Sequence, residues 1–217
     1  MSMIFKCRLF KDFTLQEINN FFRKYQTLTR TYQKDDILFH KGDNCTTVGI
    51  VVSGSIDVQE IATDGSCYLL SKLIAGHLFG EVLLYSKQHS YPATFVASSE
   101  VEVLYIDKHE LIRALGAHKK LLVNFLQLMA NRALDLNNRL KVLTKPSLRS
   151  KISSYILSVS NNEDKVAIGM TKEKLAEYLS VQRPSLSREL ISMKDDGLIH
   201  CDRKFFYIIN RDELEKL

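Results

Sequence analysis

The strongest constraint on the fold is a long series of short, β-rich segments between residues 29 and 106. β-Branched and alternating stretches such as TVGIVVSGSIDVQEI, from residue 47, and VEVLYI, from residue 101, are separated by glycine or charged turns. The glycines in these turns recur at intervals of roughly 10 residues. They are Gly42, Gly54, Gly65, Gly76 and Gly80. Short strands at this spacing predict an all-β sandwich or roll.

Helical patterns lie on both sides of this β region. Residues 14–25 predict a short amphipathic helix with Thr14 as N-cap, and Asp107 is the N-cap expected for a second helix. A longer helix is predicted over 118–143, with apolar residues mostly three or four positions apart, although Arg132 and Arg139 interrupt them. The apolar residues of this stripe are Leu122, Phe125, Met129, Leu136, Leu140 and Leu143.

The long helix needs an apolar cover along this stripe. Either the β-rich part of the chain covers it, or a second copy of the chain does. A helix that links two domains has little else to pack against, so we expect a homodimer. Pro146 should end the helix, and Ser147 can cap the next one.

Residues 171–209 predict two helices, a tight turn and a hairpin. Thr171 is the expected N-cap of the first helix, and Ser180 and Val181 form the turn. The second helix should run over about 182–196 and end at Gly197. The hairpin over 198–209 is typical of the wing of a winged helix.

The second helix of this unit separates an apolar side from a polar one. Its apolar side carries Leu186, Leu190 and Met193. Arginine can bond O6 and N7 of guanine together, and serine or a proline ring can contact phosphate or a thymine methyl. The polar side therefore predicts a recognition helix in a major groove of double-stranded DNA. The candidate base-reading residues are Gln182, Arg183, Pro184, Ser185, Ser187 and Arg188.

Four further residues are candidates for contacts with the DNA backbone: Thr171 and Lys172 at the start of the first helix, and Arg203 and Lys204 at the hairpin tip. The alternative is a three-helix packing unit with a solvated basic face that binds no DNA. The short, hydrogen-bonding polar face and the hairpin that follows it favour DNA. The net charge of +5 is compatible with a polyanionic partner but equally with a slightly basic soluble protein.

Other classes of protein receive little support from the sequence. We find no signal-peptide pattern and no membrane-spanning apolar run, which predicts a cytoplasmic protein with no membrane partner. Cys7, Cys45, Cys67 and Cys201 lack metal-ligand spacing and are expected to be free thiols, so no metal site is predicted. No nucleophile and base cluster together and no phosphate loop is present, so we do not expect an enzyme.

Taken together, several motifs resemble the Crp/Fnr superfamily of bacterial transcription regulators. They are FHKGD (39–43), VVSGSIDV (51–58), DG (64–65), AGHLFGE (75–81), the long helix and SVQRPSLSREL (180–190). The resemblance covers nearly the whole chain. It implies a cyclic-nucleotide-binding-type β-roll, a dimerising helix and a C-terminal winged helix. It assigns base reading to Arg183, Pro184 and Arg188, and since many members carry glutamate at the middle position, Pro184 should alter the base preference.

The resemblance does not imply cyclic AMP as the effector. The Arg-Ser pair that grips the cyclic phosphate in such members corresponds to Tyr91 and Pro92, which supply no cation. The Thr-Ser pair that meets adenine corresponds to Leu136 and Asn137, and only Gly80 and Glu81 match the ribose-contacting positions.

Other effectors stay open, and the cofactor stays unknown. A less polar molecule could bind among Phe79, Tyr91, Phe95 and Leu136, or the chain could have lost its effector. Redox sensing by Cys7, Cys45 or Cys67 and haem binding by His77 are further alternatives, which the sequence does not decide.

The predicted fold class is α+β: an N-terminal antiparallel, jelly-roll-like β-roll over 1–117, a long dimerisation helix and hinge over 118–145, and a winged helix-turn-helix over 146–217. The predicted function is a homodimeric transcription regulator that reads an inverted-repeat operator under the control of a small effector other than cyclic AMP. RNA polymerase is a further candidate partner, although no residue pattern marks a surface for it. The alternative is a ligand-binding or scaffold protein whose winged helix contacts another protein.

Overall fold

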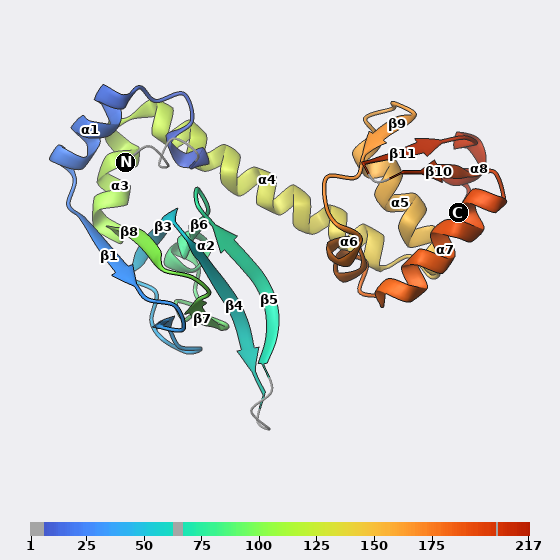
Figure 1. Cartoon of the computed structure of the whole chain (residues 1–217). Coiled ribbons are helices and arrows are strands. Elements are labelled where there is room, and N and C mark those ends of the chain that lie inside the picture. The colour runs from blue at the N-terminus through green and yellow to red at the C-terminus, as the bar shows by residue number, and fades with distance from the viewer. Residues whose placement is uncertain (1–6, 63–66, 203) are drawn as a thin grey trace. The chain divides into compact units, whose positions relative to one another are not determined.

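The computed structural model describes residues 7–62, 67–202 and 204–217. The chain divides into two compact units, Met1–Ala130 and Asn131–Leu217, and the helix α4 (Lys119–Leu143) runs through the boundary (Figure 1). Its bounds agree with the predicted 118–143. The three-part domain division at residues 117 and 145 stays a prediction. Among the described residues, no helix combines the length and hydrophobicity of a transmembrane segment.

The N-terminal unit is a roll of two antiparallel four-stranded sheets. The first has the order β1 (Thr27–Tyr32), β8 (Val101–Asp107), β3 (Thr47–Ser53) and β6 (Leu78–Phe79). The second has the order β2 (Ile37–Phe39), β7 (Thr94–Ala97), β4 (Ser55–Ile61) and β5 (Cys67–Ile74). Residues of β3, β4 and β8 alternate across the pleat or lie buried on both faces. The predicted antiparallel roll is confirmed.

Gly54 shows why a glycine is needed in one of the turns. It joins β3 to β4 with a φ of +76°, and a Cβ on it would lie 2.0 Å from the carbonyl oxygen of Glu100. A side chain at this position would meet both left-handed strain and a backbone clash. The turn therefore depends on Gly54, as the glycine spacing predicts. Gly65 lies outside the described residues.

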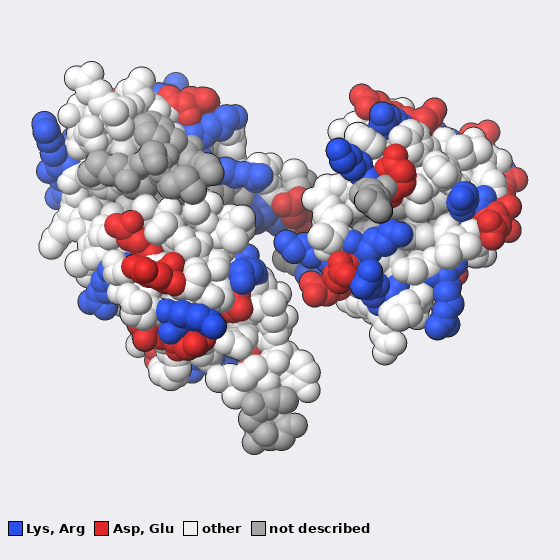
Figure 2. All heavy atoms as spheres, viewed as in Figure 1, with Lys and Arg blue, Asp and Glu red and all other residues white. Residues whose placement is uncertain are grey.

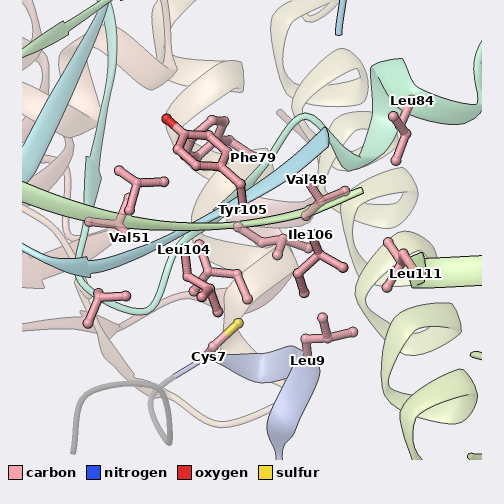
Figure 3. Close-up of a cluster of buried hydrophobic side chains, with 14 of the residues drawn as sticks. Cys7, Leu9, Val48, Val51, Phe79, Leu84, Leu104, Tyr105, Ile106 and Leu111 are labelled. Carbon is pink, nitrogen blue, oxygen red and sulfur yellow. The ribbon is translucent and has the colours of Figure 1, made fainter. Parts of the chain in front are cut away.

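Helices cover one face of the first sheet. Figure 3 shows side chains of β3 and β8, including Val48, Leu104 and Ile106, meeting Leu9 and Leu111. The helices of this cover are α1 (Leu15–Lys24), α3 (Lys108–Ala117) and the first half of α4. Thr14 caps α1 in a capping box with Glu17, and the Asp107 side chain accepts from the His109 amide at the start of α3. Both predicted N-caps are confirmed.

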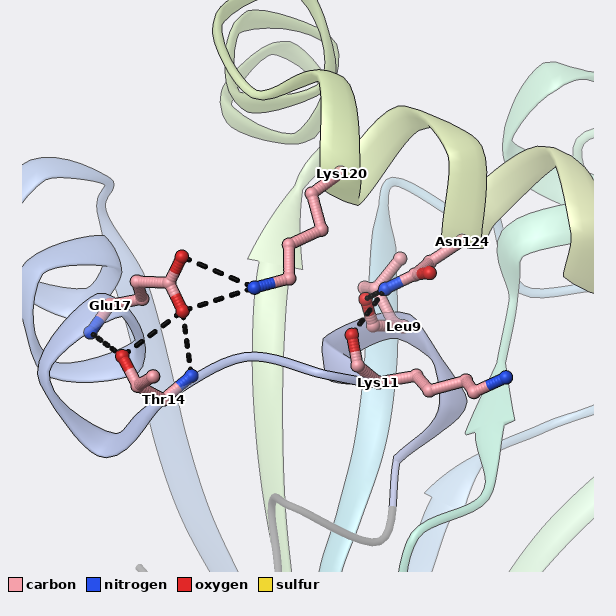
Figure 4. A network of polar contacts seen from close by, with 6 residues as sticks. All are labelled: Leu9, Lys11, Thr14, Glu17, Lys120 and Asn124. Carbon is pink, nitrogen blue, oxygen red and sulfur yellow. Dashed lines mark hydrogen bonds and ion pairs between the residues drawn. The ribbon is translucent and has the colours of Figure 1, made fainter.

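Polar contacts fasten the N-terminal segment to α4 (Figure 4). Lys120 pairs with Glu17 at 3.2 Å. Asn124, 8% exposed, donates from Nδ2 to the carbonyl oxygens of Leu9 (3.1 Å) and Lys11 (2.8 Å). The exposed ion pair contributes little, whereas the buried amide satisfies two carbonyls that have no strand partner. Asn124 is therefore the main polar anchor of this segment.

We expect Asn124→Leu to lower the free energy of unfolding by about 1–3 kcal/mol, because two carbonyl oxygens lose their donor in a buried place. Urea unfolding followed by circular dichroism measures the change. Gln127→Leu, at an exposed position of the same helix, is the matched control and should unfold with the wild type. Equal midpoints for both variants would show that the anchor contributes nothing.

The C-terminal unit packs helices against a small sheet. Its helices are α5 (Leu148–Ser160), α6 (Lys172–Tyr178), α7 (Arg183–Asp195) and α8 (Arg211–Glu215). The sheet has the order β10 (Ile199–Cys201), β11 (Phe205–Ile208) and β9 (Lys165–Ala167). The core of this unit includes Val142 from the end of α4, Ile156, Leu186 and Phe206. Ser147 caps α5, as predicted.

Two elements of this unit were not predicted. β9 has three residues, two of them exposed, and it is defined as a strand by its hydrogen-bonded pairing with β11. α8 has five residues, with Asn210 as N-cap and one buried side chain, Leu214. Segments this short carry too few residues for a period to be visible in sequence. The predicted two-stranded wing is thus part of a three-stranded sheet.

Candidate nucleic-acid interface and the roll interior

α6 and α7 form a helix-turn-helix. Thr171 caps α6 through a bond from the Lys174 amide, and the turn passes through Ser180 at a φ of +54°. The two helices share a core whose members are all buried. It contains Leu175, Ala176, Leu179, Leu186, Leu190 and Met193. This packing fixes which side of α7 faces outward.

The outward side of α7 carries most of the predicted base-reading residues. Gln182 is the N-cap of α7 and is exposed, as are Arg183, Pro184, Ser185 and Arg188, whereas Ser187 is half-buried. Pro184 stands in the first turn, where amides lack intrahelical acceptors, so it costs the helix no hydrogen bond. The structure thus brings all six residues to the N-terminal half of one helix.

One of these arginines already has a partner. Arg183 pairs with Glu173 of α6 at 2.9 Å, and both side chains are more than half exposed. Exposed pairs of this kind contribute little to stability, so Arg183 can exchange this carboxylate for another acceptor at small cost. Among the described residues, Arg188 has no ion-pair partner.

Arg149 of α5 holds the other end of α7, a role that the sequence did not suggest. Its guanidinium pairs with Glu189 and with Asp196, each at 2.7 Å, and donates to the Ser192 hydroxyl at 2.7 Å. These contacts lie on successive turns of α7 and just beyond its end. The partners are 40 or more residues away in the chain, so no local pattern could have paired them.

The described residues predicted to contact the DNA backbone lie at the start of α6 and in the β10–β11 turn. Thr171 and Lys172 are exposed at the start of α6, and Lys204 is exposed in the β10–β11 turn. Arg203 lies outside the described residues. The Asp202 carboxylate shapes this turn by accepting from the amides of Lys204 (2.6 Å) and Phe205 (2.7 Å), and these bonds lower the pKa of Asp202. In Figure 2, lysine and arginine side chains gather over α6 and α7, with a few acidic ones among them.

Aromatic rings fill the interior of the roll beside the predicted effector residues. The rings of Phe39 and Tyr91 stack with centroids 4.3 Å apart, and Phe95 lies 5.1 Å from Tyr91 and 5.5 Å from Phe79. Tyr91 is 1% exposed, and burial, with a smaller effect from Cys45, raises the pKa of its phenol. The phenol of Tyr91 is therefore neutral at ordinary pH and supplies no charge to the interior of the roll.

The remaining predicted effector residues occupy different surroundings. Gly80 is the N-cap of α2 (Glu81–Tyr85) with a φ of +83°, and a Cβ there would lie 2.8 Å from the carbonyl oxygen of Thr47. Glu81 is 1% exposed, whereas Pro92 is exposed. Leu136 and Asn137 are exposed on α4 and belong to the C-terminal unit. Within the roll, the structure thus brings together Phe79, Gly80, Glu81, Tyr91 and Phe95.

The surroundings of Cys7 and Cys45 give no support to redox sensing by these two thiols. Burial raises the pKa of Cys7 to about 11 and also raises that of Cys45, so both are protonated thiols at neutral pH, unlike reactive cysteines. Cys67 and His77 are exposed. The described residues contain no group of three or more side chains placed to hold a metal ion.

α4 has two apolar faces, and the structure separates them. Leu121, Phe125 and Leu128 are buried in the core of the roll, so Phe125 does not belong to a free stripe as predicted. The second face is exposed or half-exposed at every position and follows a regular four-three spacing. It consists of Leu122, Leu126, Met129, Ala133, Leu136, Leu140 and Leu143, of which Met129 also packs against the core of the roll. Arg132 and Arg139 stand beside this face rather than on it.

Two family models match the chain, one in each unit. The cyclic nucleotide-binding domain matches residues 29–118, and the Crp-like helix-turn-helix domain matches residues 150–217. Among curated relatives, the anaerobic regulatory protein of Bacillus subtilis is 22% identical over 84% of this chain and 79% of its own length. The cAMP-activated global transcriptional regulator CRP of Haemophilus influenzae is 23% identical over 80% of each chain.

Solved structures share the fold at similar identities. CprK complexed with OCPA superposes with a TM-score of 0.67 and 17% identity over 93% of each chain. The catabolite activator protein of Thermus thermophilus does so with a TM-score of 0.55 and 21% identity over 96% of this chain and 97% of its own. Both family models and these relatives agree with the motifs of the sequence. The chain belongs to the Crp/Fnr superfamily and is a DNA-binding transcription regulator rather than an enzyme.

Proposed function

We propose that the protein acts as a homodimer that reads an inverted-repeat operator, with one α7 in each half-site. The observation that carries this proposal is the outward N-terminal half of α7. Its surface carries two arginines and three small residues that can form hydrogen bonds or apolar contacts: Arg183, Arg188, Pro184, Ser185 and Ser187. In helix-turn-helix proteins this part of the second helix contacts base edges. The half-sites should lie about one helical turn apart.

The contacts divide into two classes. Gln182, Arg183, Pro184, Ser185, Ser187 and Arg188 read bases, whereas Thr171, Lys172, Arg203 and Lys204 contact phosphates. Arg183 leaves Glu173 to bond a guanine, and the released carboxylate faces water at the edge of the interface. Contacts of the second class set the affinity for any DNA, and contacts of the first class set the sequence.

The dimer forms through the exposed face of α4. Leucines at Leu122, Leu126, Leu136 and Leu140 are 38–61% exposed within one chain and repeat with the spacing of a coiled-coil seam. Exposed leucines in a regular row are typical of an interface between two copies. A symmetric dimer also matches an inverted repeat, because each subunit then meets the same half-site sequence.

The effector, if one binds beside α2, differs from cyclic AMP. A cyclic phosphate needs a cation to offset its desolvation, and the position that would supply it carries the buried ring of Tyr91. The rings of Phe79, Tyr91 and Phe95 favour an apolar molecule. Titration with cyclic AMP should give no saturable heat of binding.

Selection from a randomised DNA library at two salt concentrations tests the proposed function. We expect an inverted repeat to be enriched, with affinity falling steeply as salt rises, because phosphate contacts release counterions. A winged helix that contacts a protein through an apolar surface would enrich no sequence and depend little on salt.

We expect Arg188→Ala to weaken operator binding by about 1–3 kcal/mol and to relax the preference at one base pair, because a bidentate contact with guanine is lost. Fluorescence anisotropy on a set of single-base operator variants measures both effects. Lys194→Ala, exposed in the last turn of α7, is the matched control and should keep the full preference. A uniform loss over all variants would assign Arg188 to a phosphate instead.

A further inference from the structure

A cleft opens at the edge of the roll where β1 and β2, the edge strands of the two sheets, both contribute residues. Its volume is about 520 Å³, within the usual range for small-molecule sites. No residue predicted to contact an effector lines it, although Phe39 of its wall stacks on Tyr91 and the Thr47 carbonyl lies close to Gly80, the N-cap of α2. Its walls come from β1, β2, the start of β3 and the end of β8. They consist of Gln26, Thr27, Leu28, Arg30, Tyr32, Leu38, Phe39, Thr46, Thr47, Tyr105 and Asp107.

The pairing of β1 with β8 arranges one wall of this cleft. Leu28 lies opposite Tyr105, and Arg30 lies opposite Val103. Residues two apart on a strand share a face with their cross-strand partners, so Leu28, Arg30, Tyr32 and Tyr105 belong to one surface. On this surface, Arg30 is flanked along β1 by Tyr32 on one side and by Leu28, the partner of Tyr105, on the other.

The two tyrosine hydroxyls meet beside Arg30. Their oxygens lie 3.0 Å apart, so one hydroxyl donates to the other and one O–H hydrogen is left for another acceptor. Burial and the bond with Tyr32 raise the pKa of Tyr105, while the charge of Arg30 acts in the opposite direction. Among the described residues, Arg30 has no ion-pair partner. A cation and a spare hydroxyl donor thus stand together at one end of the cleft.

The other parts of the cleft differ in character. Leu28, 50% exposed, and the half-buried Leu38 and Phe39 supply apolar surface. Asp107 lies four residues beyond Val103 on β8, about 13 Å along the strand, where its side chain already accepts from the His109 amide. The cleft therefore has one free cation at one end and a carboxylate committed as a helix cap at the other.

We infer that this cleft binds an organic monocarboxylate with an apolar body. The carboxylate pairs with the Arg30 guanidinium and accepts the spare hydrogen of the Tyr32–Tyr105 pair, and the body lies against Leu28, Leu38 and Phe39. A phosphate monoester is disfavoured because it carries close to two charges and the lining holds one cation. The inference does not rest on the proposed operator reading, and the residues that line this cleft differ from those predicted to contact an effector beside α2.

Isothermal titration of the full chain with octanoate, without DNA, tests the inference. We expect saturable binding with one site per chain and weaker binding of octan-1-ol, which has the same body without the charge. Arg30→Gln should weaken octanoate binding about tenfold or more, because a charged hydrogen bond is lost. Arg23→Gln, which removes an exposed arginine of α1 outside the cleft, is the matched control and should bind as the wild type.

A charge reversal separates recognition from loss of folding. Arg30→Glu should lose octanoate and bind octylammonium more tightly than the wild type does, which an unfolded roll could not do. Tyr32→Phe should weaken octanoate binding by a smaller factor than Arg30→Gln, since one hydroxyl of the pair remains. No saturable binding of octanoate to the wild type, or equal binding by Arg30→Gln, would overturn the inference. Neither result would bear on DNA binding, which the library selection measures separately.

Discussion

The double variant Leu136→Asp/Leu140→Asp is expected to be a monomer and to bind the full operator about 100-fold or more weakly than the wild type. Both leucines are more than half exposed within one chain and lie on the free face of α4. In the proposed dimer, each substitution removes an apolar contact and places a carboxylate where it has no partner, twice per dimer because the interface is symmetric. A monomer then has to bind each half-site by itself and loses the gain from linked binding.

Sedimentation velocity and fluorescence anisotropy measure the two effects. The control Gln127→Glu/Asn131→Asp adds the same two charges to exposed positions of α4 outside the four-three row, and it should remain a dimer with unchanged affinity. Binding to a single half-site should be equal in both variants, because α7 is untouched. A dimeric Leu136→Asp/Leu140→Asp protein would move the interface away from α4.

The starts of α1, α3, α5 and α6 were predictable from sequence because their signals are local, whereas the five-residue helices α2 and α8 were not predicted. Each of four N-cap side chains accepts a hydrogen bond from an amide two or three residues later, so the cap and its helix appear in one short stretch of sequence. These caps are Thr14, Asp107, Ser147 and Thr171. The winged helix-turn-helix was predictable for a similar reason. The apolar period of α7 fixes its buried side, and the turn between its helices has a short, recognisable length.

The assignment of faces on α4 was not predictable in the same way. Phe125 and Leu126 are adjacent apolar residues, and both fit a helical stripe. Only the packing of the roll, which takes Leu121, Phe125 and Leu128 into its core, shows that the free row passes through Leu126. A period locates apolar faces, but it does not tell which partner covers each of them.

The sites formed by residues far apart in the chain could not be predicted from the sequence either. Tyr91 was predicted to line an effector pocket, but the stacking of its ring on Phe39, some fifty residues earlier in the chain, was not predictable. The cleft between β1 and β2 depends on the register that sets Arg30 beside the Tyr32–Tyr105 pair. Register follows from the pairing of whole strands, and a one-residue shift would turn Arg30 to the opposite face.

Arg149 also makes contacts between segments far apart in the chain, and replacing it should have a second large effect, on operator binding. Arg149→Met should weaken specific operator binding about tenfold or more, because the guanidinium ties α5 to α7 through Glu189, Ser192 and Asp196. Arg149 belongs to α5 and its contacts are internal, so we interpret it as a positioning residue. Without it, Glu189 and Asp196 lose their cation, and the angle at which α7 is presented becomes less defined.

Three comparisons distinguish positioning from a general loss of charge. Lys216→Met removes one exposed cation from the same unit and should bind the operator as the wild type does. Arg149→Lys should recover only part of the affinity, since one ammonium cannot reproduce the planar fork that reaches three partners. In a double-mutant cycle, Glu189→Gln should cost little once Arg149 has been replaced, because the two residues act through one contact.

The readout specific to positioning is the ratio of operator binding to binding of unrelated DNA. Base contacts require α7 at a defined depth and angle, whereas phosphate contacts tolerate small rotations. Arg149→Met should therefore lower the operator affinity by a larger factor than the affinity for unrelated DNA. An equal loss on both would mean that Arg149 contributes to the electrostatic attraction of DNA, and the contacts with Glu189 and Asp196 would then have no part in sequence reading.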